Sequence, residues 1–254
     1  MRIAVVIPAY DEAGNIGRLI EETVASVPAD ILQEIIVIDD ASDDGTGAEI
    51  KALIPRHKPL RYLRHAQRAG QSAALRSGVM AATAPVIATM DGDGQNDPGD
   101  IMRLLAKLGS EGGEPAMVAG IREGRKAAGS RKLASRFANW IRDKVLADGC
   151  PDTGCGIKLY RRDAFLELPF FNSMHRYLPA LFLTYGHEIA YEAVNDRPRL
   201  RGTSKYTNLG RALIGLYDLV GVSWLRKRTF IPPIAEHVSG AEAAPNRSAT
   251  SDGS

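Results

Sequence analysis

Short apolar runs alternate with segments of helical periodicity, and this alternation limits the possible folds more than any other feature. The runs and the helical segments that follow them occupy, in order, residues 2–8, 15–27, 34–40, 46–54, 60–65, 71–83, 84–91 and 100–108. Strands alternating with helices of this length indicate βαβ units and a mostly parallel sheet. The runs at 4–7 and 35–38 are apolar throughout, which is typical of strands covered on both faces. The sequence therefore predicts an α/β fold.

The pattern is weaker after about residue 115. Further strands are predicted at residues 116–121, 156–162 and 188–195, and helices at 132–146 and 208–228. Residues 236–254 contain no aromatic residue and no apolar run, so we expect this tail to be disordered.

Length and composition exclude several classes of protein. The 254 residues suffice for one large α/β domain or two small ones. The two cysteines, Cys150 and Cys155, form neither a disulfide framework nor a zinc-site pattern, which favours a reducing cytoplasm. The first apolar run is too short for a signal peptide, and no run reaches the roughly 18 residues of a membrane-spanning helix. We expect neither segment in this chain.

Carboxylates stand directly after two of the predicted strands. Asp39 and Asp40 follow the mostly apolar part of one strand at 34–38, and Asp91 and Asp93 follow the mostly apolar part of another at 85–89. Ligands bind beyond the carboxyl ends of open parallel sheets, and like charges gathered there repel unless a cation joins them. Oxygen ligands select hard ions such as Mg²⁺ or Mn²⁺. The alternative is a solvated turn, which uses the same residue types.

Four motifs resemble those of the family 2 inverting glycosyltransferases, which have the nucleotide-sugar-binding GT-A fold. They are VVIPAYDEAGNI at 5–16, IDDASDDGT at 38–46, MDGDGQNDP at 90–98 and RPRLRGTSKY at 197–206. Asp11 stands where the family usually has Asn. The chain is most similar to the polyprenyl-phosphate (dolichol-phosphate) mannosyltransferase group. The resemblance implies a Rossmann-like, mostly parallel sheet flanked by helices.

The resemblance implies two sets of residues on the donor side. Nucleotide-sugar binding falls to Pro8, Tyr10, Glu12, Asp39 and Asp91. Asp39 would contact the base. A Mg²⁺ or Mn²⁺ ion on the diphosphate would be held by Asp91, Asp93 and Gln95. Such an ion neutralises charge on the departing nucleoside diphosphate.

Basic residues gather between Arg122 and Arg136. A lipid phosphate is already anionic near pH 7, so it needs cations more than a general base. The resemblance implies that this phosphate is bound by Arg122, Arg131, Ser135, Arg199, Ser204 and Lys205. Arg131 and Arg199 are expected to be catalytic together with Asp93. The alternatives are a solvated basic face or a nucleic-acid site, but no nucleic-acid module interleaves these charges, so we expect no nucleic acid as partner.

The final helix combines an apolar surface with the cations Arg226, Lys227 and Arg228. This favours peripheral docking at the cytoplasmic face of an anionic membrane, and the alternative is a helix buried on the sheet. We expect a catalytic domain at 1–206, this amphipathic helix at 207–230 and a disordered tail at 236–254. Relatives often append membrane spans near this point, so a membrane partner subunit is a further expectation.

The resemblance implies transfer of a hexose from a nucleotide sugar to a polyprenyl or dolichyl phosphate, with inversion. GDP-mannose is the expected donor. Residues 69–78 are also similar to relatives that use UDP-sugars, although Arg68 stands where those often carry Asn. The alternatives are therefore a UDP-sugar transferase acting on undecaprenyl phosphate or on a glycan hydroxyl, and a nucleotide-sugar-binding or scaffold protein without catalysis.

Overall fold

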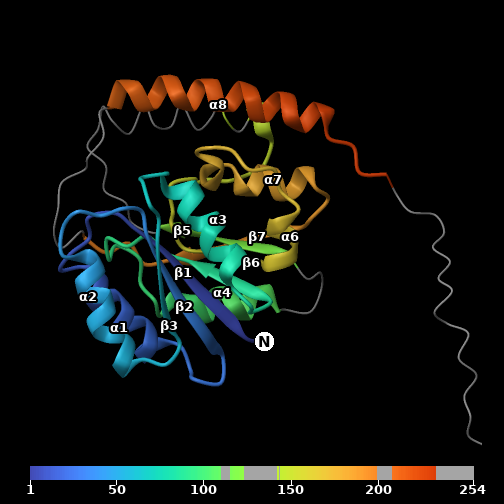
Figure 1. Cartoon of the computed structure of the whole chain (residues 1–254). Coiled ribbons are helices and arrows are strands. Elements are labelled where there is room, and N and C mark those ends of the chain that lie inside the picture. Colours follow the sequence, from blue (N-terminus) through green and yellow to red (C-terminus); the bar gives the residue numbers. More distant parts are fainter. Residues whose placement is uncertain (110–114, 123–141, 143, 199–207, 233–254) are drawn as a thin grey trace, which may run out of the picture.

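A seven-stranded sheet in the order β3-β2-β1-β4-β6-β5-β7 forms the centre of the molecule (Figure 1). The computed structural model describes residues 1–109, 115–122, 142, 144–198 and 208–232, with the side chains of 208–214 excepted. The strands are β1 (Ile3–Ala9), β2 (Leu32–Asp39), β3 (Leu60–Arg64), β4 (Val86–Thr89), β5 (Met117–Arg122), β6 (Lys158–Arg161) and β7 (Ile189–Val194). Only β6 runs antiparallel to its neighbours. The carboxyl ends of the other six strands therefore meet at one edge.

Helices cover both faces of the sheet, because alternate strand residues point to opposite sides. Val5 and Ile35 pack with residues of α1 (Ile16–Ser26), α2 (Thr46–Leu53) and α4 (Asp100–Leu108). Val6 and Ile36 pack with residues of α3 (Gln71–Ala81), α6 (Arg162–Leu166), α7 (Leu178–Thr184) and α8 (Asn208–Arg228). Both faces of the central strands are thus covered, as their unbroken apolar runs predict.

The α/β fold and the mostly parallel sheet are confirmed. All seven predicted strands form, and the helices predicted at residues 15–27, 46–54, 71–83, 100–108 and 208–228 form as well. The helix predicted at 132–146 lies mostly outside the described residues, as does the tail at 236–254. Two short helices, α6 and α7, and two 3₁₀ turns, Ile54–Arg56 and Met174–Arg176, were not predicted.

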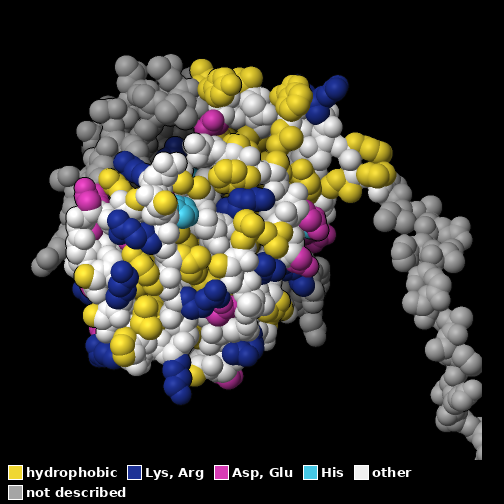
Figure 2. All heavy atoms as spheres, in the orientation of Figure 1, with side chains coloured by type: hydrophobic (Ala, Val, Ile, Leu, Met, Phe, Trp, Pro, Cys, Tyr) yellow, Lys and Arg dark blue, Asp and Glu magenta, His cyan; other side chains and the backbone are white. Residues whose placement is uncertain are grey.

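The final helix lies over α7 rather than on the sheet (Figure 1), and it is apolar on two faces. On the inner face, Leu219 and Val222 are buried in the core. On the outer face, Tyr217, Val220 and Trp224 are 81%, 64% and 63% exposed. Figure 2 shows hydrophobic side chains gathered along this outer face. Within the described residues, no helix is both long and apolar enough to span a bilayer.

Candidate active site

The candidate site lies where the strand order reverses, beside the carboxyl end of β1. The chain runs outward from β1 to β2 and β3, and then returns to place β4 on the other side of β1. In open α/β sheets such a reversal leaves a crevice in which ligands bind. Tyr10, Asp39 and Asp91 follow or end β1, β2 and β4, so the fold brings these three predicted residues to one edge.

The loop after β1 is held by residues of the loop and helix after β2. The Glu12 N–H donates to Thr46 Oγ1 (2.8 Å), and the Glu49 carboxylate accepts from the N–H groups of Gly14 (2.7 Å) and Gly17 (2.9 Å). A Cβ at Gly17 would lie 3.1 Å from Glu49 Cδ, so a glycine there makes room for this carboxylate. The negative charge also suits the amino end of α1. These contacts fix the position of Glu12 at the sheet edge.

Asp39 is fully buried and is neutralised by protein groups. Its Oδ1 accepts from the Ser42 N–H (2.7 Å), and its Oδ2 accepts from Tyr62 Oη (2.6 Å) and Arg64 Nη1 (2.9 Å). Burial raises the pKa of Asp39, but the hydrogen bonds from Ser42 and Tyr62 and the charge of Arg64 outweigh burial and hold the pKa below its ordinary value. If Asp39 contacts the nucleotide base, it does so through a carboxylate that Tyr62 and Arg64 already orient.

Asp40 organises the loop that leads into α3. Its Oδ1 lies 2.7 Å from His65 Nδ1 and accepts from the Ala69 N–H (2.8 Å), while Oδ2 accepts from the Gly70 N–H (2.7 Å). Protein donors thus already compensate both carboxylates of the Asp39–Asp40 pair. The loop held by Asp40 includes Arg68, whose guanidinium carbon lies 3.9 Å from the centre of the Tyr10 ring.

The acidic loop, residues 91–98, packs closely against β1 and β6. The Asp91 N–H donates to Asn96 Oδ1 (2.9 Å), and Gln71 Nε2 at the start of α3 donates to Asp91 Oδ1 (2.7 Å). A Cβ at Gly92 would lie 2.9 Å from Pro8 O, and a Cβ at Gly156 would lie 2.7 Å from Asp91 Oδ1. Gly92 therefore allows the loop to approach the end of β1, and Gly156 allows the Asp91 carboxylate to approach the start of β6.

Asp91 and Asp93 lie close enough for their like charges to interact. Desolvation raises the pKa of Asp91 and the like charge of Asp93 raises it further, while Lys158 and Arg122 act in the opposite direction. Asp93 is 7% exposed, and its Oδ1 accepts from the Gln95 N–H (3.1 Å). The third carboxylate, Asp97, is instead paired with Arg197 (2.8 Å).

Arg122 ends β5 at the same edge and forms a forked ion pair with Asp152. Nε donates to Asp152 Oδ2 (2.7 Å) and Nη2 donates to Asp152 Oδ1 (2.8 Å). The carboxylate raises the pKa of Arg122. A phosphate bound by Arg122 would have to share the guanidinium with Asp152. The other predicted acceptor residues, Arg131, Ser135, Arg199, Ser204 and Lys205, lie outside the described residues.

The residues present fit a divalent cation that is partly held by its substrate. Within the part of the chain that the structure describes, no group of three or more His, Cys, Asp or Glu side chains is placed to hold a metal. Mg²⁺ is commonly bound through one or two carboxylates plus substrate phosphates, and burial and the like charge of Asp93, which raise the pKa of Asp91, are both effects that a bound cation would offset. Asp91 and Asp93 therefore suit an ion that arrives with a diphosphate.

Several neighbours of the site were not predicted. They are Gln71, Tyr62, Arg64, Asn96, Lys158 and Arg197. Lys158 is 5% exposed at the start of β6, and its ammonium donates to Cys155 O. In the sequence, Lys158 is marked only as a charged residue within a predicted strand. Gln71 is the first residue of a predicted helix, a position from which a side chain can reach a neighbouring strand end.

A family model described as "Glycosyl transferase family 2" matches residues 4–168. The match includes the strands from β1 to β6 and the acidic loop, and therefore most of the site.

Two curated relatives are similar over most of the chain. The dodecaprenyl-phosphate galacturonate synthase of Rhizobium johnstonii is 31% identical over 89% of this chain and 68% of its own length. The undecaprenyl-phosphate 4-deoxy-4-formamido-L-arabinose transferase of Sodalis glossinidius is 28% identical over 86% of this chain and 67% of its own length. The chain thus spans about two thirds of these relatives.

Among solved structures, the fold is shared with glucosyl-3-phosphoglycerate synthase of Mycobacterium tuberculosis. Its complex with Mn²⁺, uridine diphosphate and glucosyl-3-phosphoglycerate superposes with a TM-score of 0.66 at 19% identity, over 89% of this chain and 79% of that one. A complex of the same enzyme with Mg²⁺ and uridine diphosphate has a TM-score of 0.65 at 19% identity, over the same shares of the two chains. At this identity the likeness shows the fold alone.

Proposed function

Since the chain belongs to glycosyl transferase family 2, we propose that it moves a sugar from a nucleotide sugar to a polyprenyl phosphate, with inversion. The observation that carries the proposal is the position of Asp91 and Asp93, which follow β4 at the reversal of strand order. The names of the two relatives, which both contain a polyprenyl phosphate, support the acceptor class. The exposed outer face of α8 supports a lipid substrate.

On the donor side, Tyr10 and Glu12 would line the base and ribose, with Asp39 oriented toward the base by Tyr62 and Arg64. Asp91, Asp93 and Gln95 would hold Mg²⁺ or Mn²⁺. The ion, when bound, neutralises charge on the leaving diphosphate. Gln71 and Gly156 keep the Asp91 carboxylate in one place. The structures of Mycobacterium tuberculosis glucosyl-3-phosphoglycerate synthase with Mn²⁺ or Mg²⁺ support the choice of a divalent ion.

On the acceptor side, a phosphate oxygen would form the bond to the anomeric carbon as the diphosphate leaves. A phosphate monoester has its second pKa near 6, so this oxygen is anionic without a general base. Arg131 and Arg199 would hold the acceptor phosphate and offset its repulsion from the donor diphosphate. Arg122, which Asp152 already neutralises, would act mainly by fixing the neighbouring loop.

At the membrane, α8 would lie with Tyr217, Val220 and Trp224 toward the lipid. Lys227 and Arg228 would meet the anionic headgroups at the cytoplasmic face. Arg226 is less suited to this role, because its Nη1 donates to the Leu146 carbonyl inside the protein. The association is peripheral in this proposal, and a membrane partner subunit remains an expectation.

The identity of the transferred sugar is the most specific part of the proposal. The expectation of mannose stays a prediction, because the two relatives are named for galacturonate and for a formamido-arabinose. The test is a donor panel of GDP-mannose, UDP-galacturonate and UDP-4-deoxy-4-formamido-L-arabinose. Each donor is incubated with a short polyprenyl phosphate and Mg²⁺ or Mn²⁺, and the products are identified by mass spectrometry. One donor should give a polyprenyl-phosphate sugar.

The acceptor class is tested separately. Arg131→Ala and Arg199→Ala should each reduce transfer by an amount equivalent to about 2–4 kcal/mol, as for the loss of one electrostatic stabiliser. Their affinity for the nucleotide should change much less. Arg199→Lys should restore activity only in part, because lysine keeps the charge and loses the fork. Equal turnover of unphosphorylated polyprenol would exclude the lipid-phosphate acceptor, and nucleotide binding without any turnover would favour the non-catalytic alternative.

A further inference from the structure

Arg197 connects three separate parts of the chain at the acidic loop. We propose that Arg197 is a positioning residue, which holds this loop where Asp91 and Asp93 can meet the donor diphosphate. The proposal rests on the function proposed above, since it takes the acidic loop as the seat of the metal and the diphosphate.

The main chain at Arg197 pairs directly with the acidic loop. The Arg197 N–H donates to Gln95 O (3.1 Å), and Gln95 Nε2 donates to Arg197 O (3.4 Å). One residue away on each side, Asn96 and Asp196 form an antiparallel bridge. The loop after β4 and the segment after β7 therefore form a short two-stranded contact beyond the end of the sheet.

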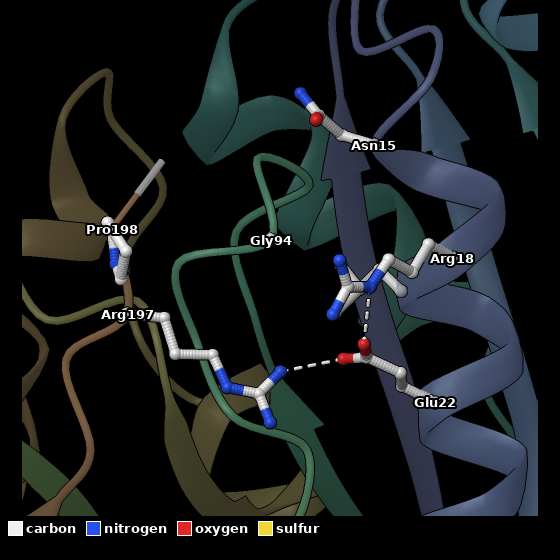
Figure 3. Close-up of a pocket in the computed structure, with 7 residues that line it drawn as sticks. Asn15, Arg18, Glu22, Gly94, Arg197 and Pro198 are labelled. Atoms are coloured by element: carbon white, nitrogen blue, oxygen red, sulfur yellow. Dashed lines mark hydrogen bonds and ion pairs between the residues drawn. The ribbon is translucent and has the colours of Figure 1, made fainter. Parts of the chain in front are cut away.

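The side chain of Arg197 joins the loop to α1. Nη2 lies 2.8 Å from Asp97 Oδ1, and Nη1 lies 2.7 Å from Glu22 Oε2. Figure 3 shows Arg197 and Arg18 pointing at Glu22 from opposite sides of the pocket, and Arg18 Nε lies 2.6 Å from Glu22 Oε1. Both partners of Arg197 are carboxylates on different elements. A planar guanidinium can serve two acceptors at once, whereas an ammonium cannot match this geometry.

The loop is packed against the sheet elsewhere, but at Gly94 it borders open space. Gly94 lines a pocket of about 190 Å³ together with residues of α1 and with Arg197. Gly94 has φ +74°, a left-handed conformation favoured by glycine, and a Cβ there would meet no heavy atom within 4 Å. Segments with few packed contacts open locally at low cost. Arg197 spans this pocket, so its loss would remove the ion pair that joins the loop to α1, while the main-chain contact with residues 196 and 197 and the hydrogen bond from Gln71 would remain.

The experiment compares Arg197→Ala, Arg197→Lys and Glu22→Gln with the wild type. Arg56→Ala serves as a matched control. Arg56 also forms an ion pair with α1, through Glu21 (3.1 Å), the residue before Glu22, but this pair does not involve the acidic loop. Two quantities are measured on the full chain. One is amide hydrogen exchange of the peptide covering residues 91–100. The other is Mn²⁺ affinity in the presence of UDP or GDP, by electron paramagnetic resonance.

Arg197→Ala should exchange about tenfold faster over residues 91–100 and bind Mn²⁺ with about 10- to 100-fold lower affinity, the usual effect of losing a group that orients a metal ligand. For Arg197→Lys and Glu22→Gln, the exchange rate and the Mn²⁺ affinity should lie between those of Arg197→Ala and the wild type. Both quantities should be the same in Arg56→Ala as in the wild type. Unchanged exchange in the Arg197 variants overturns the inference, as does faster exchange with unchanged Mn²⁺ affinity. If Arg197→Ala does not fold, Arg197→Lys and Glu22→Gln decide by the same criteria. A wild type that binds no Mn²⁺ with either nucleotide contradicts the proposed function instead.

Discussion

A single methyl group at Gly156 should displace the Asp91 carboxylate. The Cβ of an alanine there would lie 2.7 Å from Asp91 Oδ1 and closer still to Oδ2. Ordinary contacts of a Cβ with its neighbours begin at 3.4 Å, so the carboxylate must retreat by about 1 Å. The main chain of Gly156 has no positive φ, so the substitution adds no backbone strain.

The expected effect is on catalysis more than on stability. A misplacement of about 1 Å at a reacting centre can cost about 100-fold in rate, equivalent to roughly 2.7 kcal/mol. Asp91 would also lose the geometry of its hydrogen bond from Gln71 (2.7 Å). We therefore expect Gly156→Ala to reduce kcat/KM by about two orders of magnitude and to weaken Mn²⁺ binding in the presence of the donor nucleotide.

The assay is initial-rate transfer to a short polyprenyl phosphate, beside thermal unfolding of the same sample. Gly109→Ala is the control, because a Cβ there meets only the Leu105 carbonyl, at an ordinary 3.7 Å. The control should keep wild-type activity. If Gly156→Ala transfers sugar at the wild-type rate while remaining folded, then the observed position of Asp91 is not required for the reaction, and its assignment to the metal is wrong.

Three further predictions concern metal, membrane and pH. Asp93→Ala should abolish transfer without lowering the melting temperature, and excess EDTA should do the same to the wild type; full turnover in EDTA would remove the metal from the mechanism. Replacing Lys227 and Arg228 together by Glu should release the protein from anionic vesicles at low salt, and unchanged sedimentation would make these cations incidental. Asp39→Asn should lower the free energy of unfolding at pH 7 by about 1.5–3 kcal/mol, the usual worth of hydrogen bonds to a charged group. Because folding lowers the pKa of Asp39, this difference should be full above the ordinary aspartate pKa of about 4 and shrink as the pH falls through the lower folded-state pKa. Denaturant unfolding at pH 7 and pH 3 checks it, and an undiminished difference at pH 3 would contradict it.

The strands and the long helices could be predicted because their periodicity is local. The apolar runs and the helical spacing each depend on neighbours a few residues apart, and the bounds of α8 match the predicted 208–228. The short helix α7, Leu178–Thr184, carries five consecutive buried residues from Leu178 to Phe182. A run buried on all sides has no polar face, so no helical period marks it in the sequence.

The partners of the site residues could not be predicted, because they come from distant parts of the chain. The sequence identifies Asp40 as a charge at a strand end, but its donor Gly70 lies 30 residues away. The ion pair of Arg197 with Glu22 joins residues 175 positions apart. Arg197 is the first residue of the motif at 197–206, two residues before Arg199, but the resemblance assigns it no role. A sequence pattern can therefore place a residue at the site without saying whether a ligand or the protein compensates its charge.

The carboxylates at this edge of the sheet differ in what neutralises them, and the difference points to where a cation would bind. Asp39 and Asp40 each accept three hydrogen bonds from protein groups, and Asp97 is paired with Arg197. For Asp91, desolvation and the charge of Asp93 outweigh the nearby cations, so its ionised form is disfavoured. A divalent cation beside Asp91 would reverse this balance, since it is the strongest local charge such a site can receive. The pair after β2 is thus compensated within the protein, whereas the proposed metal ligands Asp91 and Asp93 follow β4.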